Sequence, residues 1–106
     1  LGESLKDASN RELHEEIGFA GTEFIHLKQL SLSPSYMRSG IDVVLVRGLY
    51  PSKLDGDEPE PLELVPWKLN NLTELYIQED FTEGRALAAL TLAQEYLAGR
   101  FPGKEL

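Results

Sequence analysis

The sequence has no cysteine among its 106 residues, so a disulfide framework and a thiolate metal site are both excluded. It also has no signal-peptide pattern and no apolar run near the roughly 20 residues that a membrane span needs. Basic residues are few, 10 against 18 acidic ones, and the formal net charge is −8. Because no dense stretch of lysine or arginine is present, we expect no binding to nucleic acid. The lack of an apolar run argues against membranes, and the lack of cysteine fits a cytoplasmic protein.

A helix is predicted from about Leu5 to Glu16. Ser4-Leu5-Lys6-Asp7 has the form of a capping box, in which side chains satisfy the free N–H groups of the first turn. Gly18 suits the left-handed residue that commonly ends a helix. The chain opens with Leu1 and enters this helix signal at once, which indicates part of a longer polypeptide.

Three carboxylates crowd the end of this helix, those of Glu12, Glu15 and Glu16. At ~100° per residue they share one side of the helix. Like charges at this spacing cost a few tenths of a kcal/mol per pair, and the helix dipole costs roughly 0.3–1 kcal/mol more for each. Two interpretations are open: a solvated acidic face, or a site for a hard cation such as Mg²⁺, which takes oxygen ligands. In the second, the neighbouring Arg11 can pair with a carboxylate and fix its direction.

These residues resemble the signature of the Nudix hydrolase family. That signature is a Gly, five residues, a Glu, seven residues, and then Arg-Glu-apolar-x-Glu-Glu-x-Gly-apolar. Glu3, seven residues and the stretch "RELHEEIGF" at 11–19 match every fixed position except the opening Gly, which would lie before Leu1. The resemblance implies an α/β fold, the Nudix α/β/α sandwich with a mixed sheet. Residues 1–106 would form the C-terminal portion of a single Nudix domain, beginning inside the signature and lacking the N-terminal strands.

The same resemblance implies roles for the charged residues of the signature. Glu12, Glu15 and Glu16 would bind Mg²⁺ or Mn²⁺, directly or through water, and count with Arg11 as the catalytic set. Arg11 and Glu3 would form a structural pair that holds the loop and the helix together. For His14 the family implies little, and a solvated side chain is the plainest interpretation.

Beyond the signature, three strands are predicted from their β-branched, aromatic and apolar residues: Thr22–Ser33, Ile41–Tyr50 and Leu62–Trp67. The second is the most continuously apolar and is therefore predicted to be an interior strand. Trp67 is assigned to the core in preference to a base-stacking role.

Helices are predicted in the last third of the chain. Asn71 and Asp80 are candidate caps for brief helices. The clearest helix runs from Glu83 to Ala98 and is ended by Gly99. Its apolar face is wider than one core contact needs, so it either packs wholly in the core or also meets a second subunit.

Two loops carry further candidate residues. In the acidic stretch "DGDEPEP" at 55–61, the resemblance to Nudix pyrophosphatases acting on ADP-sugars implies that Glu58 or Glu60 is the general base or an additional metal ligand. Glu60 is slightly preferred because it lies nearer a predicted strand, and an exposed acidic turn is the alternative. Between the first two predicted strands, Tyr36 could stack on a substrate and Arg38 could pair with phosphate, although ordinary loop residues explain them equally well.

The stretches "LSPSY", "LYPSKLDGDEPEPLELVPW" and "FTEGRALAAL" resemble one branch of the family, the ADP-compounds hydrolases. This branch implies metal-dependent hydrolysis of the pyrophosphate bond of ADP-ribose, NADH or diadenosine polyphosphates, with release of AMP. It also implies a homodimer, for which domain swapping is one arrangement. The alternatives are a Nudix-fold module that senses a nucleotide without cleaving it, and a fragment that is inactive alone.

Overall fold

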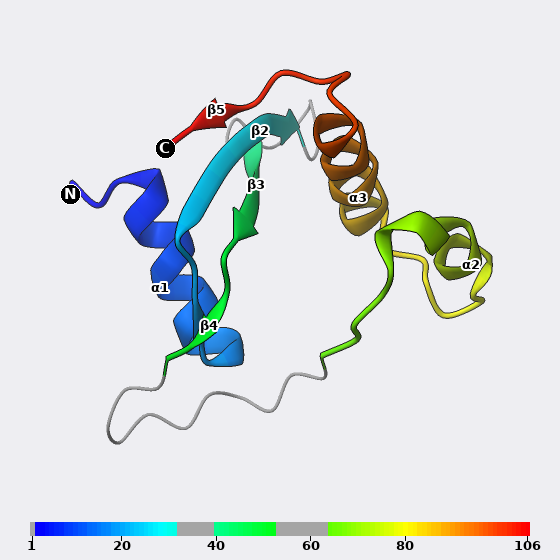
Figure 1. The fold of residues 1–106 in the computed structure, drawn as a ribbon, viewed down its shortest axis with the longest axis horizontal. Coiled ribbons are helices and arrows are strands. Elements are labelled where there is room, and N and C mark those ends of the chain that lie inside the picture. The colour runs from blue at the N-terminus through cyan, green and yellow to red at the C-terminus, as the bar shows by residue number, and fades with distance from the viewer. Residues whose placement is uncertain (1, 32–39, 53–63) are drawn as a thin grey trace. The chain divides into compact units, whose positions relative to one another are not determined.

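The computed structural model describes residues 2–31, 40–52 and 64–106 (Figure 1). The chain divides into two compact units, one formed by Leu1–Leu64 with Gly103–Leu106 and the other by Val65–Pro102. Each unit is described by itself. The assignment of the whole chain to one Nudix domain stays a prediction.

Helix α1, Leu5–Ile17, forms as predicted from its local signals. The Ser4 hydroxyl accepts a hydrogen bond from the Asp7 N–H at 3.0 Å, which satisfies one free donor of the first turn. Gly18 ends the helix at φ 71°, and its N–H donates to the carbonyl of His14. A left-handed residue closes the last turn there, and glycine adopts that conformation without a Cβ clash.

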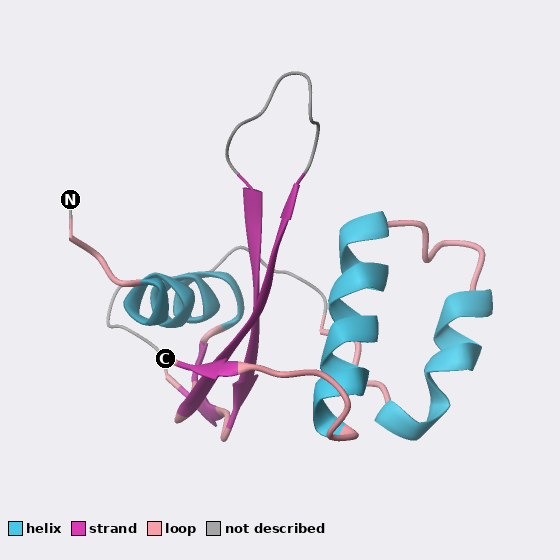
Figure 2. Cartoon of the chain, turned by 90° about the horizontal axis from the view of Figure 1, so that it is seen from above, coloured by secondary structure: helices cyan, strands magenta, loops and turns pink. Residues whose placement is uncertain are grey.

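A three-stranded antiparallel sheet has the order β3-β2-β5, formed by Gly40–Arg47, Glu23–Ser31 and Lys104–Glu105. In Figure 2, β2 and β3 are the two long neighbouring strands. The register of this pair shifts between His26 and Lys28, which marks a β-bulge. Among the described strands β2 is central and β3 lies at an edge. The prediction that the second strand is interior is therefore wrong for this part of the chain.

The predicted strand Ile41–Tyr50 is two strands, because Gly48 turns the chain at φ 69° between β3 and β4, Tyr50–Pro51. A Cβ at Gly48 would collide with the side chain of Thr22, so the turn requires glycine. Strand β4 pairs with a strand that the sequence did not reveal, β1, Phe19–Ala20. Every described pair is antiparallel, and the parallel pairing that a mixed sheet requires stays a prediction.

The core of the first unit lies on both faces of β2. Phe24 and Ile25 point to opposite faces of this strand and are only 2% and 1% exposed. Ala20, Leu27 and Val43 are buried with them. Lys6 of α1 also places its ammonium 6.0 Å from the centre of the Phe24 ring, which ties the start of the helix to the sheet.

The second unit contains the short 3₁₀ helix η1, Leu69–Asn71, with α2, Leu72–Ile77, and α3, Gly84–Leu97. Glu83 caps α3 by accepting a hydrogen bond from the Arg85 N–H at 2.8 Å.

Two predictions in this unit are wrong. Residues 64–67 form no strand, and the Trp67 indole N–H donates instead to the carbonyl of Asn71 at 2.7 Å. No helix begins after Asp80, because the chain turns there and α3 starts at Gly84. Among the described helices, none combines the length and the apolar character that a bilayer crossing demands.

Candidate active site

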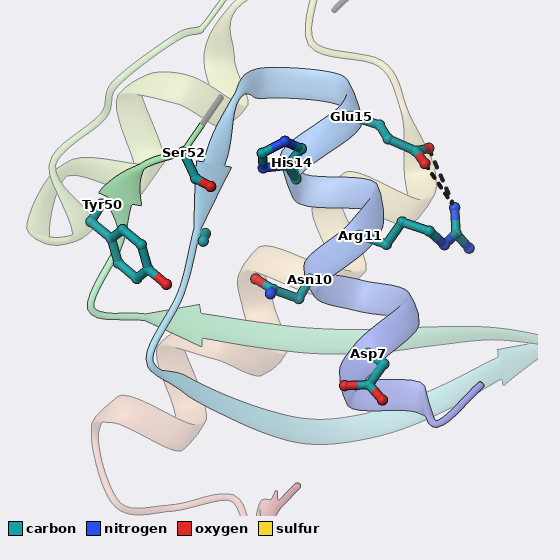
Figure 3. A pocket seen from close by; sticks show the side chains of 8 residues that line it. Asp7, Asn10, Arg11, His14, Glu15, Tyr50 and Ser52 are labelled. Carbon is teal, nitrogen blue, oxygen red and sulfur yellow. Dashed lines mark hydrogen bonds and ion pairs between the residues drawn. The ribbon is translucent and has the colours of Figure 1, made fainter. Parts of the chain in front are cut away.

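Arg11 organises the charged side of α1. Its Nε and Nη2 donate to the two carboxylate oxygens of Glu3 at 2.8 and 3.1 Å, so the predicted pair is present and bidentate. Its Nη1 lies 3.3 Å from an oxygen of Glu15, one helical turn further on. Figure 3 shows Arg11 and Glu15 pointing toward each other.

These contacts shift the pKa values of Glu3 and Arg11. The hydrogen bonds that Arg11 donates to Glu3 lower the pKa of the Glu3 carboxyl and raise the pKa of the Arg11 guanidinium. All three side chains remain about half exposed, between 43% and 51%. Solvent therefore screens the attraction, and the main effect of the network is to fix the direction of Glu15.

Glu12 and Glu16 lie in a different setting, on the wall of an open groove of about 230 Å³ between α1 and β3. The helix contributes Ser9, Glu12, Leu13 and Glu16, and the strand contributes Asp42, Val44 and Val46. Leu13, Val44 and Val46 are the apolar residues of its lining. The three signature glutamates thus share one side of α1 and have two environments, one ion-paired with Arg11 and one lining this groove.

The donor set of the groove fits a hard divalent cation, because it offers carboxylate oxygens and no nitrogen or sulfur ligand. Within residues 2–31, 40–52 and 64–106, however, no three acidic or histidine side chains converge closely enough to hold an ion. Mg²⁺ dehydrates reluctantly and uses only one or two carboxylates in many sites, so water-mediated binding suits this spacing. The roles of Arg11, Glu12, Glu15 and Glu16 stay predictions.

A second cavity of about 350 Å³ lies on the other flank of α1 (Figure 3). The residues lining it are Asp7, Asn10, Arg11, His14, Glu15, Ala20, Tyr50 and Ser52, so one signature glutamate, Glu15, faces this cavity. Asn10 accepts a hydrogen bond from the Gly21 N–H at 3.3 Å and so links the helix to the loop before β2. His14 is half-buried, and its Nε2 is buried without a hydrogen-bond partner in the described part of the chain. The interpretation of His14 as a solvated side chain is therefore wrong.

Four predicted site residues lie outside the described residues: Tyr36, Arg38, Glu58 and Glu60. Their proposed roles in substrate binding and as general base stay predictions.

Sequence reasoning missed one pair beside the groove. His26 Nε2 lies 3.0 Å from Asp42 Oδ1, which joins β2 to β3. Since an ionised carboxylate only accepts, Nε2 carries the proton in this contact. The only sequence signal was the spacing of the two residues in strand-like stretches, and that spacing becomes a contact once the register is known.

Comparison with known proteins finds similar proteins for most of the chain. No protein-family model matches the chain. The ADP compounds hydrolase NudE of Escherichia coli (strain K12) is 46% identical over 99 residues, which cover 93% of this chain and 53% of that protein. A crystal structure of an ADP compounds hydrolase matches with a TM-score of 0.83 and 46% identity, over 93% of this chain and 54% of the other. The chain is therefore similar to ADP compounds hydrolases over 93% of its length, as the sequence predicted. The structural likeness also confirms the predicted α/β fold.

The chain spans about half the length of the curated relative that it matches. The activity, substrate and partners of the whole protein are therefore matters for proposal.

Proposed function

We propose that the protein containing this chain hydrolyses the pyrophosphate bond of ADP-linked compounds, among them ADP-ribose, NADH and diadenosine polyphosphates, and releases AMP. The observation that carries the proposal is the Nudix signature on α1, with its Arg11–Glu3 ion pair formed and its acids at the groove. The names of the two similar proteins, both ADP compounds hydrolases, support the same substrate class.

Charge explains why this acidic chain needs a cation. A pyrophosphate diester is anionic, and at −8 the protein would repel both it and an attacking hydroxide. Mg²⁺ or Mn²⁺ held by Glu12, Glu15 and Glu16 would neutralise phosphate charge and lower the pKa of a bound water. We therefore propose these three residues as the metal ligands, directly or through water.

Residues of this chain would then orient the metal ligands and accept the proton of the attacking water. Arg11 donates to Glu3 through two nitrogens of its guanidinium and to Glu15 through the third. The contact with Glu3 fixes the guanidinium, which in turn fixes the direction of Glu15, so Arg11 acts as a positioning residue. The general base would be one of the signature glutamates, or Glu58 or Glu60. A general base must reach the attacking water within hydrogen-bond distance, which favours a carboxylate close to the bound metal. Tyr36 and Arg38 are proposed for substrate contact.

We also propose that the protein is a cytoplasmic homodimer. The absence of cysteine and the apolar, alanine-rich sequence of α3 support this assignment.

The test is release of AMP from ADP-ribose and NADH with and without Mg²⁺, using the polypeptide as its gene encodes it and the variant Glu16→Gln. Turnover that requires the metal and is lost in the variant is the expected result. No turnover on either substrate would contradict the proposal. Nucleotide binding without turnover would instead favour the sensor module.

A further inference from the structure

We propose that Asp42 of β3, held in place by His26 of β2, is a further residue of the cation site. It would accept hydrogen bonds from the water shell of the ion that Glu12 and Glu16 hold from the opposite wall of the groove. The inference rests on the proposed function for the presence of the ion. It concerns two residues that lie outside the Nudix signature.

The position of Asp42 follows from the sheet register. Asp42, Val44 and Val46 alternate along β3 and so share one face, which is the face that lines the groove under α1. Glu12 and Glu16 stand one turn apart on the helix and form the other wall. Asp42 therefore brings a carboxylate to the groove from the strand side.

His26 fixes the direction of this carboxylate. His26 lies opposite Val44 in the ladder, which makes it the diagonal neighbour of Asp42 on the same face. Its Nε2–H donates to Asp42 Oδ1 at 3.0 Å, and the two side chains are only 27% and 33% exposed. One oxygen of Asp42 is thereby engaged, and a carboxylate can accept further hydrogen bonds on its other oxygen.

The groove leaves room for an ion that keeps its water. It is an open space of about 230 Å³, so water molecules can lie between the carboxylates. Mg²⁺ takes six ligands in octahedral geometry and usually keeps several of them as water. Acids that do not converge on one point can still hold such an ion through its waters, and outer-shell carboxylates of this kind tune metal affinity.

The experiment measures Mn²⁺ affinity by the electron paramagnetic resonance signal of the free ion, with the polypeptide as its gene encodes it. Asp42→Asn should bind Mn²⁺ about tenfold more weakly than the unchanged protein. His26→Leu should weaken binding in the same direction. His26→Gln should restore part of the loss, because its amide can still donate to the carboxylate. Adding His26→Leu to Asp42→Asn should weaken binding no further.

Asp7→Asn is the matched control. It removes one negative charge from the first turn of α1, at the opposite end of the helix from Glu16, and it reports how far a change of net charge alone alters Mn²⁺ affinity, which should stay within about twofold of that of the unchanged protein. Thermal unfolding followed by circular dichroism shows whether each variant is folded. Because a merely structural pair would alter the melting temperature without altering affinity, a loss of affinity at an unchanged melting temperature supports the proposal.

Affinities of Asp42→Asn or His26→Leu within about twofold of the unchanged protein would overturn the inference. If Glu16→Gln loses Mn²⁺ binding while both of these variants keep it, this inference alone fails. If the unchanged protein binds no Mn²⁺, the inference falls together with the proposed metal dependence. Binding of Mn²⁺ without hydrolysis of ADP-ribose would count against the proposed function, and the comparison of variants would still decide the role of Asp42.

Discussion

Helices α1 and α3 both carry a glutamate near the C-terminal end, but Glu95 of α3 pairs with Arg100 at 2.6 Å, whereas Glu16 of α1 has no ion pair among the described residues. In α3, Glu83 stands at the N-terminus, where the helix dipole favours a negative charge, and it also caps the backbone and pairs with Arg85 at 2.7 Å. In α1, Glu15 and Glu16 stand in the last turn, where the dipole opposes them. The carboxylate of Glu83 thus stabilises its own helix, whereas Glu12 and Glu16 of α1 have no ion pair among the described residues that would offset their charge.

This difference separates structural charges from functional ones. A carboxylate that satisfies the backbone and a neighbouring arginine is explained by folding alone. Carboxylates placed against the dipole and against one another require another source of stabilisation, and a bound cation supplies one. Within the described residues, the ion pairs of α1 involve Glu3 and Glu15 but not Glu12 or Glu16, which leaves those two for the groove.

The largest expected effect is on activity, from Glu16→Gln. Metal-dependent release of AMP from ADP-ribose should fall about 100-fold or more, because the substitution removes charge from the site where phosphate charge must be offset. The melting temperature should stay the same or rise, since an unfavourable charge leaves the end of the helix. Glu83→Gln is the counterpart and should show the reverse, lowered stability with activity retained. Equal loss of activity in both variants would break the comparison between the helices.

A smaller effect is expected from Arg11→Lys. Lysine keeps the positive charge but cannot form the two parallel hydrogen bonds to Glu3 while reaching Glu15. Because the residue acts by orienting a ligand, the rate of hydrolysis and the apparent affinity for Mg²⁺ should each fall about tenfold. Titration of the rate with Mg²⁺ measures both. Arg47→Lys, which changes an exposed pair with Glu23 on the sheet, serves as the control and should leave both unchanged. A rate that falls with no change in Mg²⁺ dependence would argue against a positioning role.

Ser4→Ala should cost about 1 kcal/mol of stability, because the Asp7 N–H loses its hydrogen-bond acceptor. Chemical unfolding monitored by circular dichroism measures this change. Ser4→Asp should keep most of the stability, since its carboxylate can accept the same hydrogen bond. The result sharpens the comparison by showing that the start of α1 obeys the same capping rule as the start of α3. Equal stabilities of the Ala variant and the unchanged protein would contradict it.

The smallest effect concerns pH. Hydrogen bonds from Arg85 lower the pKa of Glu83 from 4.5 to about 2. A group whose pKa is depressed in the folded state stabilises the protein above the pKa of the unfolded chain, and this contribution is lost as pH falls from 4.5 toward 2. Urea unfolding at several pH values should show a shallower acid dependence in Glu83→Gln than in the unchanged protein. Glu74→Gln, which removes a charge from α2, should not reproduce that change, and an identical slope in all three proteins would refute the assignment.

Local signals predicted the helices well and the strands less well. α1 has its capping serine and terminal glycine in the sequence, and α3 begins one residue from its predicted start. The two-residue strand β1 has no such signal, because only its pairing with β4 defines it. The apolar run of β3 suggested an interior strand, yet it reflects contacts on the two faces of the sheet, which do not determine how many strands lie alongside.

The sequence likewise predicted some features of the candidate site and not others. Helical periodicity placed Glu12, Glu15 and Glu16 on one side of α1, and the Arg11–Glu3 pair followed from the family signature. Periodicity could not assign Glu15 to Arg11 and the other two acids to a groove, since that depends on side-chain direction and on the strand packed nearby. Asp42 was out of reach for the same reason, because its partner is 16 residues away in the chain.

The central place of β2 has a consequence for hydrogen exchange. Ile25 and His26 are flanked by partners on both edges, Leu45 and Val44 on one and Glu105 and Lys104 on the other. Amides bonded within such a ladder exchange only when a whole cooperative unit opens, whereas helix ends fray independently. The backbone carrying His26 should therefore be among the slowest to exchange in the first unit, and the last turn of α1 among the faster. Strand β3, which forms one wall of the groove, would then pair with a rigid strand, whereas the end of α1, which forms the other wall, could change its position when a ligand binds.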